Sequence, residues 1–359
     1  MTSSSFQVTG APATPTTAPP PPPPPPPAPA PPPPKPGLVA ATGPPTPTRT
    51  RGCCLLTPHA APFMKDRFGV GIVDPASAGT HHFAGQDTFG ITYTCAGGFF
   101  DFGHARDTLD QTRFHYYHLT QGGQNKPGGS YRGFYLSGAL VKVKAKIPDD
   151  QVLETAASLA YDESVFHEIE TWYQMDIGGH HSSFSPEDLV SNFLGTWVAR
   201  KAIPMGGDFD TAATTQLKNL LTQFGARPPA DTRAAFAAIT GRWIIPTKDY
   251  NSGTDLRYLL RRSFEVDPVV PWLVPNLGFC TSTTWPSSVP KGFSTAIKNR
   301  YDISFIVPAY ASADLGKTLQ RSTFAGAMAK IKTEAAQPRP DPPGVDTAPT
   351  STSSEGPRA

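Results

Sequence analysis

Two stretches of the sequence place histidines and carboxylates at helical spacing. His104 and Asp107 are three residues apart, and Glu163 and His167 are four residues apart. Side chains with these separations lie on one face of an α-helix, so the members of each pair can converge on one point. Imidazole and carboxylate groups are suitable ligands for zinc, iron or manganese. The spacing therefore predicts a divalent-metal site between two helices.

A zinc ion with three protein ligands and one open position lowers the pKa of a bound water to about 7 and so supplies a nucleophile for hydrolysis. In such a site we expect Glu170 or Glu168 to act as general base and Arg106 to stabilise an oxyanion or a phosphate. The first functional hypothesis is thus a metal-dependent hydrolase acting on a phosphoester, a peptide or an amide. The glycine-rich loop over 122–129 does not match a phosphate-binding loop, so no nucleotide cofactor is indicated.

Plainer interpretations of the same residues remain open. Glutamate and histidine at helical spacing are also typical of a solvated, ion-paired helix face, or of a buried polar network that joins two helices. The rival hypothesis is accordingly a non-enzymatic binding or structural module. Two further pairs, His180 with His181 and His81 with His82, lie near glycines in expected loops and are weaker metal candidates.

Cysteine chemistry gives a second alternative, a hydrolase that uses Cys95. This residue precedes an Ala-Gly-Gly stretch and is followed by His104, which could supply a base. Cys95 can equally be a buried structural thiol or the disulfide partner of Cys53 or Cys54. These three residues and Cys280 lack the CxxC spacing that is typical of a structural zinc site.

The pattern of apolar residues and capping residues predicts a mostly helical α+β domain with a small sheet. The clearest helix start is Ser185-Pro186-Glu187, which places serine at the N-cap and proline at the first helical position. Helices are expected over 103–120, 150–175, 186–201, 211–224, 230–240, 254–264 and 313–334, and strands over 68–73, 89–95, 140–147 and 301–307.

The ends of the chain differ in composition from its middle. Prolines are concentrated in the first fifty residues, with an unbroken run over 19–27 that favours an extended polyproline II conformation. We therefore expect a disordered arm over 1–50, one globular domain over 51–335 and a disordered tail over 336–359. The arm would act as a spacer or as a ligand for an aromatic-lined groove.

Charge and hydropathy bear on partners and location. The net charge is +2, and the best basic run, Lys142, Lys144 and Lys146, alternates with apolar residues as on a half-buried strand, so no nucleic-acid partner is indicated. No run of eighteen apolar residues is present, and the first residues lack the basic and apolar regions of a signal peptide. We expect a soluble protein, cytoplasmic by default and exported if the start codon is misassigned.

Three separated segments resemble one bacterial family of unknown function. The segments are 93–107 (YTCAGGFFDFGHARD), 167–173 (HEIETWY) and 184–195 (FSPEDLVSNFLG). Together with the Cys53-Cys54 pair they are similar to domain of unknown function 4056, over about residues 51–335. The resemblance implies a bacterial source and carries no assigned activity. Two of the three segments contain the histidines and acids selected above for their chemistry.

Overall fold

The computed structural model describes residues 71–85, 87, 89–134, 138–173, 183–248 and 255–336. The predicted proline-rich arm over 1–50, the predicted tail over 336–359 apart from Ala336, and the residues Cys53, Cys54, His180 and His181 lie outside the described residues. The predicted domain boundaries at 50 and 335 therefore remain predictions.

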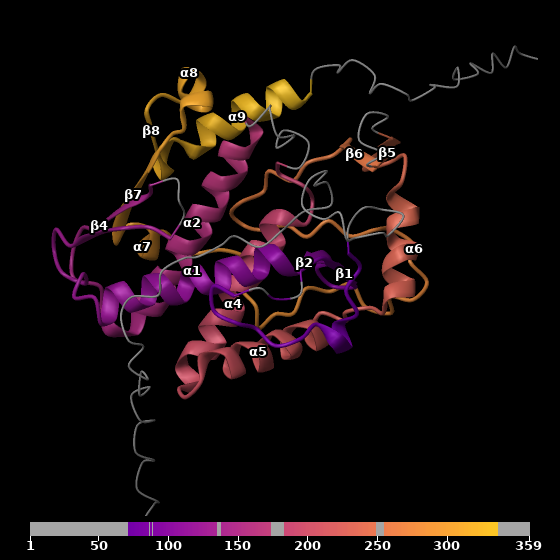
Figure 1. Ribbon diagram of the computed structural model, residues 1–359, viewed down its shortest axis with the longest axis horizontal. Helices are drawn as coiled ribbons and strands as arrows, with labels where there is room; N and C mark the ends of the chain where they lie inside the picture. The colour runs from indigo at the N-terminus through magenta and orange to yellow at the C-terminus, as the bar shows by residue number, and fades with distance from the viewer. Residues whose placement is uncertain are drawn as a thin grey trace, which may run out of the picture. The chain divides into compact units, whose positions relative to one another are not determined.

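Three long helices pack against one another at the centre of the described structure. They are α1 (Phe102–Thr120), α2 (Val152–Trp172) and α4 (Asp188–Ala202), and α5 (Phe209–Gln223) packs on α4 (Figure 1). Gly195 lets α4 approach α1 closely, because a Cβ atom there would collide with the carbonyl of Ala105 and the hydroxyl of Thr108. The close approach places the middle of α4 against the first two turns of α1.

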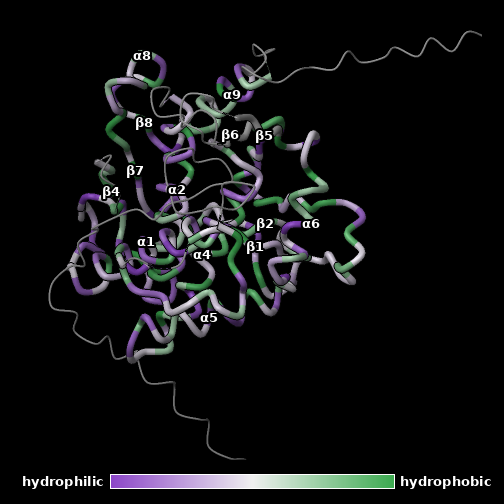
Figure 2. Tube along the Cα trace, turned by 45° about the vertical axis from the view of Figure 1, so that its right-hand side comes forward, coloured by the Kyte–Doolittle hydropathy of each residue, from purple (hydrophilic) through white to green (hydrophobic). Residues whose placement is uncertain are grey.

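Helix α1 was predicted over 103–120 and is confirmed, but its surroundings differ from those of an amphipathic surface helix. Nearly every residue over 102–115 is buried, including the polar side chains of His104, Arg106, Asp107 and Gln111. Figure 2 accordingly shows hydrophilic residues along α1, within the packed helices. The polar stripe is thus interior, where each polar group requires a partner.

A four-stranded antiparallel sheet packs on one side of α2. Its strand order is β3 (Ser130–Arg132), β4 (Leu140–Val143), β7 (Tyr301–Ile306) and β8 (Thr318–Gln320). The predicted alternation is confirmed over 140–143, where Val141 and Val143 are buried and Lys142 is exposed, but the strand ends at Val143 rather than Ile147 and Ala145 is exposed. Phe305 of β7 stacks on Phe166 of α2 at 4.1 Å between ring centroids, which joins sheet and helix.

Two hairpins and a helix surround a second, smaller apolar cluster. The hairpins are β1 (Ile91–Thr94) with β2 (Gly98–Asp101), and β5 (Ile244–Lys248) with β6 (Asp255–Leu259); the helix is α6 (Pro229–Ile239). The prediction of a helix over 254–264 was wrong. A short apolar run fits both a helix and a strand, and here pairing with β5 decides in favour of a strand.

The C-terminal part of the described chain contains short helices between strands. The predicted helix over 313–334 is interrupted at Gly316, whose φ of 76° is left-handed, and by β8. Two α-helices take its place, α8 (Ser312–Leu315) and α9 (Phe324–Ala335). The short helix α7 (Thr295–Lys298) precedes β7. Short 3₁₀ segments are η1 (Pro75–Ser77), η2 (Asp149–Gln151), η4 (Ile203–Met205), η5 (Ala309–Ala311) and η6 (Arg321–Thr323).

The architecture is α+β with helix predominating, as the sequence predicts. None of the helices in the described part of the chain has both the length and the apolar character that a membrane crossing requires.

Candidate metal centre

Three long helices each contribute one side chain to a compact group of potential metal ligands. His104 comes from α1, Glu168 from α2 and Asp188 from α4, and one ligand atom of each lies within 4.8 Å of the other two. Their side chains belong to residues that are 4%, 2% and 0% exposed, respectively. We call these three residues the ligand trio.

The first turn of α1 positions His104. Asp101 caps this helix, and its carboxylate accepts hydrogen bonds from the backbone amides of Gly103 (2.6 Å) and His104 (3.1 Å). The backbone amide of Asp101 in turn donates to the Ser191 hydroxyl of α4 at 2.8 Å. The starts of α1 and α4 are therefore joined directly beside the trio.

A tight turn ahead of α4 orients the two carboxylates. The amide of Phe184 donates to Oε2 of Glu168 at 2.8 Å, and the amide of Ser185 donates to Oδ2 of Asp188 at 2.8 Å. The Ser183 hydroxyl holds the carbonyl of Glu168 at 2.6 Å. Phe184 has a φ of 56°, a left-handed conformation that is uncommon for a bulky residue and is imposed by this turn.

One oxygen of each carboxylate is left without a hydrogen bond from the backbone. Within the described residues, Oε1 of Glu168 accepts no hydrogen bond, and Oδ1 of Asp188 has the His104 ring beside it, with Nε2 at 3.1 Å. For a tetrahedral zinc with ligands at about 2.0–2.1 Å, neighbouring ligand atoms are about 3.3 Å apart. The His104–Asp188 separation is close to that value.

The helix that carries Asp188 begins later than predicted. Ser185 was expected at the N-cap, whereas α4 begins at Asp188 with Glu187 as its N-cap. The Ser185 hydroxyl instead donates to Oε2 of Glu187 at 2.5 Å. Asp188 was missed as a site residue because an acid after Ser-Pro is already explained as a favourable charge in a first helical turn.

Burial is unfavourable for the negative charges of the two carboxylates in the trio. It raises the pKa of Asp188 well above the ordinary value of an aspartate, and the neighbouring carboxylate of Glu168 raises it further, while His104 opposes the shift. Two buried carboxylates beside one imidazole form a donor set that a divalent cation could satisfy.

Two residues predicted as metal ligands, His167 and Asp107, are not members of the ligand trio. The rings of His167 and His104 have their centroids 6.5 Å apart, and His167 is half-buried. Asp107 is buried one turn beyond His104 on α1. Glu168, predicted as a general base, lies inside the ligand trio itself.

Glu163, predicted as a metal ligand, is found in a different buried cluster. Its carboxylate accepts from the amide of Phe134 at 3.1 and 3.2 Å and lies 3.4 Å from Nε2 of His115. The other ring nitrogen of His115 lies 3.1 Å from the Tyr131 hydroxyl. This cluster joins α1 and α2 to the β3 strand.

The two remaining predicted residues have other contacts. Glu170 is half-buried and accepts a hydrogen bond from the Tyr310 hydroxyl at 2.6 Å. The guanidinium of Arg106 pairs with Asp87 at 2.9 Å and donates to the backbone carbonyls of 78 and 80 at 2.7 and 3.0 Å. Arg106 thereby fastens the 78–87 segment to α1.

The weaker candidate His81 belongs to that same segment. Its ring is fully buried between Asp110, at 2.9 Å from Nε2, and Asp87, at 3.3 Å from Nδ1. His82 is more exposed and lies 3.8 Å from Asp210. The contacts of His81 fit a structural role, since both ring nitrogens face carboxylates that also hold backbone amides of the segment.

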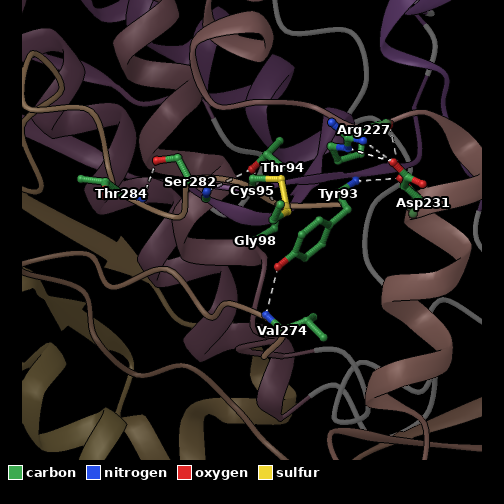
Figure 3. Close-up of a disulfide and its surroundings, with 12 residues drawn as sticks. Tyr93, Thr94, Cys95, Gly98, Arg227, Asp231, Val274, Ser282 and Thr284 are labelled. Carbon is green, nitrogen blue, oxygen red and sulfur yellow. Dashed lines mark hydrogen bonds and ion pairs between the residues drawn. A yellow bond between two sulfur atoms is a disulfide. The ribbon is translucent and has the colours of Figure 1, made fainter. Parts of the chain in front are cut away.

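Cys95 forms a disulfide with Cys280, from which it is separated by 185 residues (Figure 3). The bond lies beside Tyr93, whose hydroxyl accepts a hydrogen bond from the amide of Val274 at 3.0 Å. Two earlier interpretations are therefore corrected: a sulfur in a disulfide is not a thiolate nucleophile, and it is not available to Cys53 or Cys54. The local spacing of residues in the sequence cannot identify a cysteine partner that lies so far along the chain.

Comparison with protein families places the chain in a family without an assigned activity. The model of the family described as "Protein of unknown function (DUF4056)" matches residues 69–272, which is more than half of the chain, and the protein belongs to this family. All three residues of the ligand trio lie within the matched range. The searches of curated proteins and of solved structures found no match.

Proposed function

We propose that the protein binds one divalent cation through His104, Glu168 and Asp188 and uses it to catalyse hydrolysis. The observation that supports this proposal is the convergence of three ligand atoms, from three different helices, within 4.8 Å of one another. Imidazole with two carboxylates is a donor set that suits zinc, iron or manganese.

The surrounding contacts support a prepared site. The amides of Phe184 and Ser185 fix one oxygen of each carboxylate, and the other oxygen of each has no hydrogen bond within the described residues and so is available to a cation. Because the two carboxylates are already held in place, less side-chain conformational entropy is lost when a cation binds.

A bound cation would supply Lewis acidity, which polarises a carbonyl or phosphoryl group and lowers the pKa of water. Among the chain's own residues, half-buried His167 has its ring 6.5 Å from that of His104 and is suited to carry a proton to or from the reacting group. The substrate class is proposed as a phosphoester, a peptide or an amide.

The depth of the trio favours a second candidate function. Its residues are at most 4% exposed, so the cation would also serve as a structural clamp that joins α1, α2 and α4. This is the non-enzymatic alternative, and it needs no substrate.

Hydrolysis assays on the metal-loaded protein separate the two candidates. Chromogenic phosphomonoesters, phosphodiesters, carboxylic esters and peptide anilides would be tested with zinc, manganese or iron, and again after chelation. Catalysis predicts turnover that is lost on chelation and in His104→Ala, and retained in the control Glu170→Gln, whose carboxylate contacts Tyr310. A structural clamp predicts that chelation lowers the melting temperature and that no substrate is turned over.

A further inference from the structure

Asn192 is a buried residue of α4 whose side-chain nitrogen has no hydrogen-bond partner among the described residues. The residue is 2% exposed, and within the described residues its Nδ2 donates no hydrogen bond. A buried amide nitrogen left unpaired costs on the order of 1–3 kcal/mol. The nitrogen and oxygen of a carboxamide exchange by a 180° turn of its plane, so the group can present either atom to a ligand.

The position of Asn192 on α4 directs it toward Asp188. The two residues are four apart, which places Asn192 one turn further along the same helix face. Side chains on a helix slant toward its N-terminus, so the carboxamide of Asn192 leans back over the turn that holds Asp188.

Contacts between α4 and α1 agree with that direction. The backbone carbonyl of Asn192 accepts a hydrogen bond from the Thr108 hydroxyl at 2.8 Å, and Thr108 lies one turn beyond His104 on α1. Neighbouring Ser191 holds the amide of Asp101, the cap of the helix turn that contains His104. The Asn192 turn therefore packs directly against the turn that supplies the histidine ligand.

The three side chains of the ligand trio would fill only part of the coordination sphere of a bound cation. Zinc takes four ligands, and manganese or magnesium takes about six, most of them oxygens. Helical metal sites commonly draw two ligands from one helix at a spacing of three or four residues. We propose that Asn192 supplies a fourth protein ligand, its carboxamide oxygen, to the cation held by the trio, and so strengthens binding of oxygen-preferring cations such as Mn²⁺.

This inference rests on the proposed function, because it needs a cation at the trio. Gln111 offers a matched control. It is also a buried amide, and neither its nitrogen nor its oxygen has a hydrogen-bond partner within the described residues. It lies on α1 two turns beyond His104, so its side chain is not expected to reach the cation.

The test measures the affinity of the full-length, chelator-treated protein for Mn²⁺, from the electron paramagnetic resonance signal of the free ion. Asn192→Leu keeps the size of the side chain and removes the oxygen, and we expect at least a 10- to 100-fold loss of affinity. Asn192→Asp keeps the oxygen and adds a charge, so its affinity should equal or exceed that of the unmodified protein. Gln111→Leu should bind Mn²⁺ as the unmodified protein does.

Thermal unfolding of each metal-free variant checks that its fold is intact. If Asn192→Leu does not unfold cooperatively, Asn192→Ser is used in its place, because the serine side chain is too short to reach the cation. Equal affinities of the Asn192 variants and the unmodified protein, together with lost binding in His104→Ala, would overturn the role of Asn192 and leave the trio intact. Equal losses in Asn192→Leu and Gln111→Leu would also overturn it. If the unmodified protein binds neither Mn²⁺ nor Zn²⁺, the proposed function itself fails.

Discussion

The Cys95–Cys280 disulfide should make a large contribution to the stability of the protein. It closes a loop of about 186 residues, since its cysteines are 185 positions apart. In the chain-entropy treatment such a loop lowers the entropy of the unfolded chain by about 18 cal/mol/K, which stabilises the folded state by about 5 kcal/mol at 25 °C. That amount is comparable to the entire stability of many domains.

The perturbation is the double variant Cys95→Ala, Cys280→Ala, compared with the unmodified protein by urea unfolding with and without reductant. Without reductant, the variant should be less stable by up to about 5 kcal/mol, with a lower midpoint. With reductant, the unmodified protein should fall to nearly the stability of the variant, because its unfolded chain is then equally free.

Peptide mapping under non-reducing conditions shows whether the linked peptide is present in the same samples. If the bond is present and reduction leaves the stability unchanged, the loop-closure reasoning is refuted. If peptides containing Cys95 and Cys280 are recovered unlinked from protein prepared under oxidising conditions, the pairing itself is contradicted.

Three further predictions concern residues outside the ligand trio. Burial raises the pKa of Asp162 to about 6 from 3.8, so the folded state retains a proton that the unfolded chain has lost between these pH values. The free energy of unfolding should therefore fall by about 2–3 kcal/mol as the pH rises from 4 to 7, and Asp162→Asn should remove that fall in pH-dependent urea titrations. Gly195→Ala should destabilise the protein by about 1–3 kcal/mol or more by pushing α4 away from Ala105, and a normal melting temperature would contradict this close approach. Arg106→Met should cost about 3–5 kcal/mol, because the buried carboxylate of Asp87 loses its guanidinium, yet it should leave metal stoichiometry at its normal value once the protein is folded at low temperature.

The periodicity of apolar residues predicted the three helices that carry the ligand trio, α1, α2 and α4. His104 was selected because a histidine and an acid at helical spacing form a local signal. Its partner Asp188 was not found, because the same acid is sufficiently explained as a favourable charge at a helix start. Glu163 follows the same spacing rule as His167 but is held by the amide of Phe134, from a loop that no local pattern connects to it. The spacing of residues shows which side chains share one face of a helix, but it does not show which other part of the protein packs against that face.

Contacts between distant segments account for the other differences. The strand β6 and the Cys95–Cys280 pairing both depend on partners that fold back from elsewhere in the chain. The burial of α1 on nearly all sides is likewise produced by α2, α4 and the 78–87 segment together. Its sequence, with many polar residues, is typical of a half-exposed helix, and tertiary contacts to most of those polar groups, such as Arg106 and His115, offset the cost of burying them.

The most direct test of the central claim is the metal content of the purified, untagged protein, measured by elemental mass spectrometry beside His104→Ala and Asp188→Asn. Both variants should be checked for a cooperative unfolding transition so that loss of metal is not loss of fold. The account predicts close to one zinc, iron or manganese per chain in the unmodified protein and a strongly reduced content in both variants. Absence of metal from the unmodified protein even after incubation with these cations, or equal metal content in all three proteins, would contradict a metal centre at His104, Glu168 and Asp188.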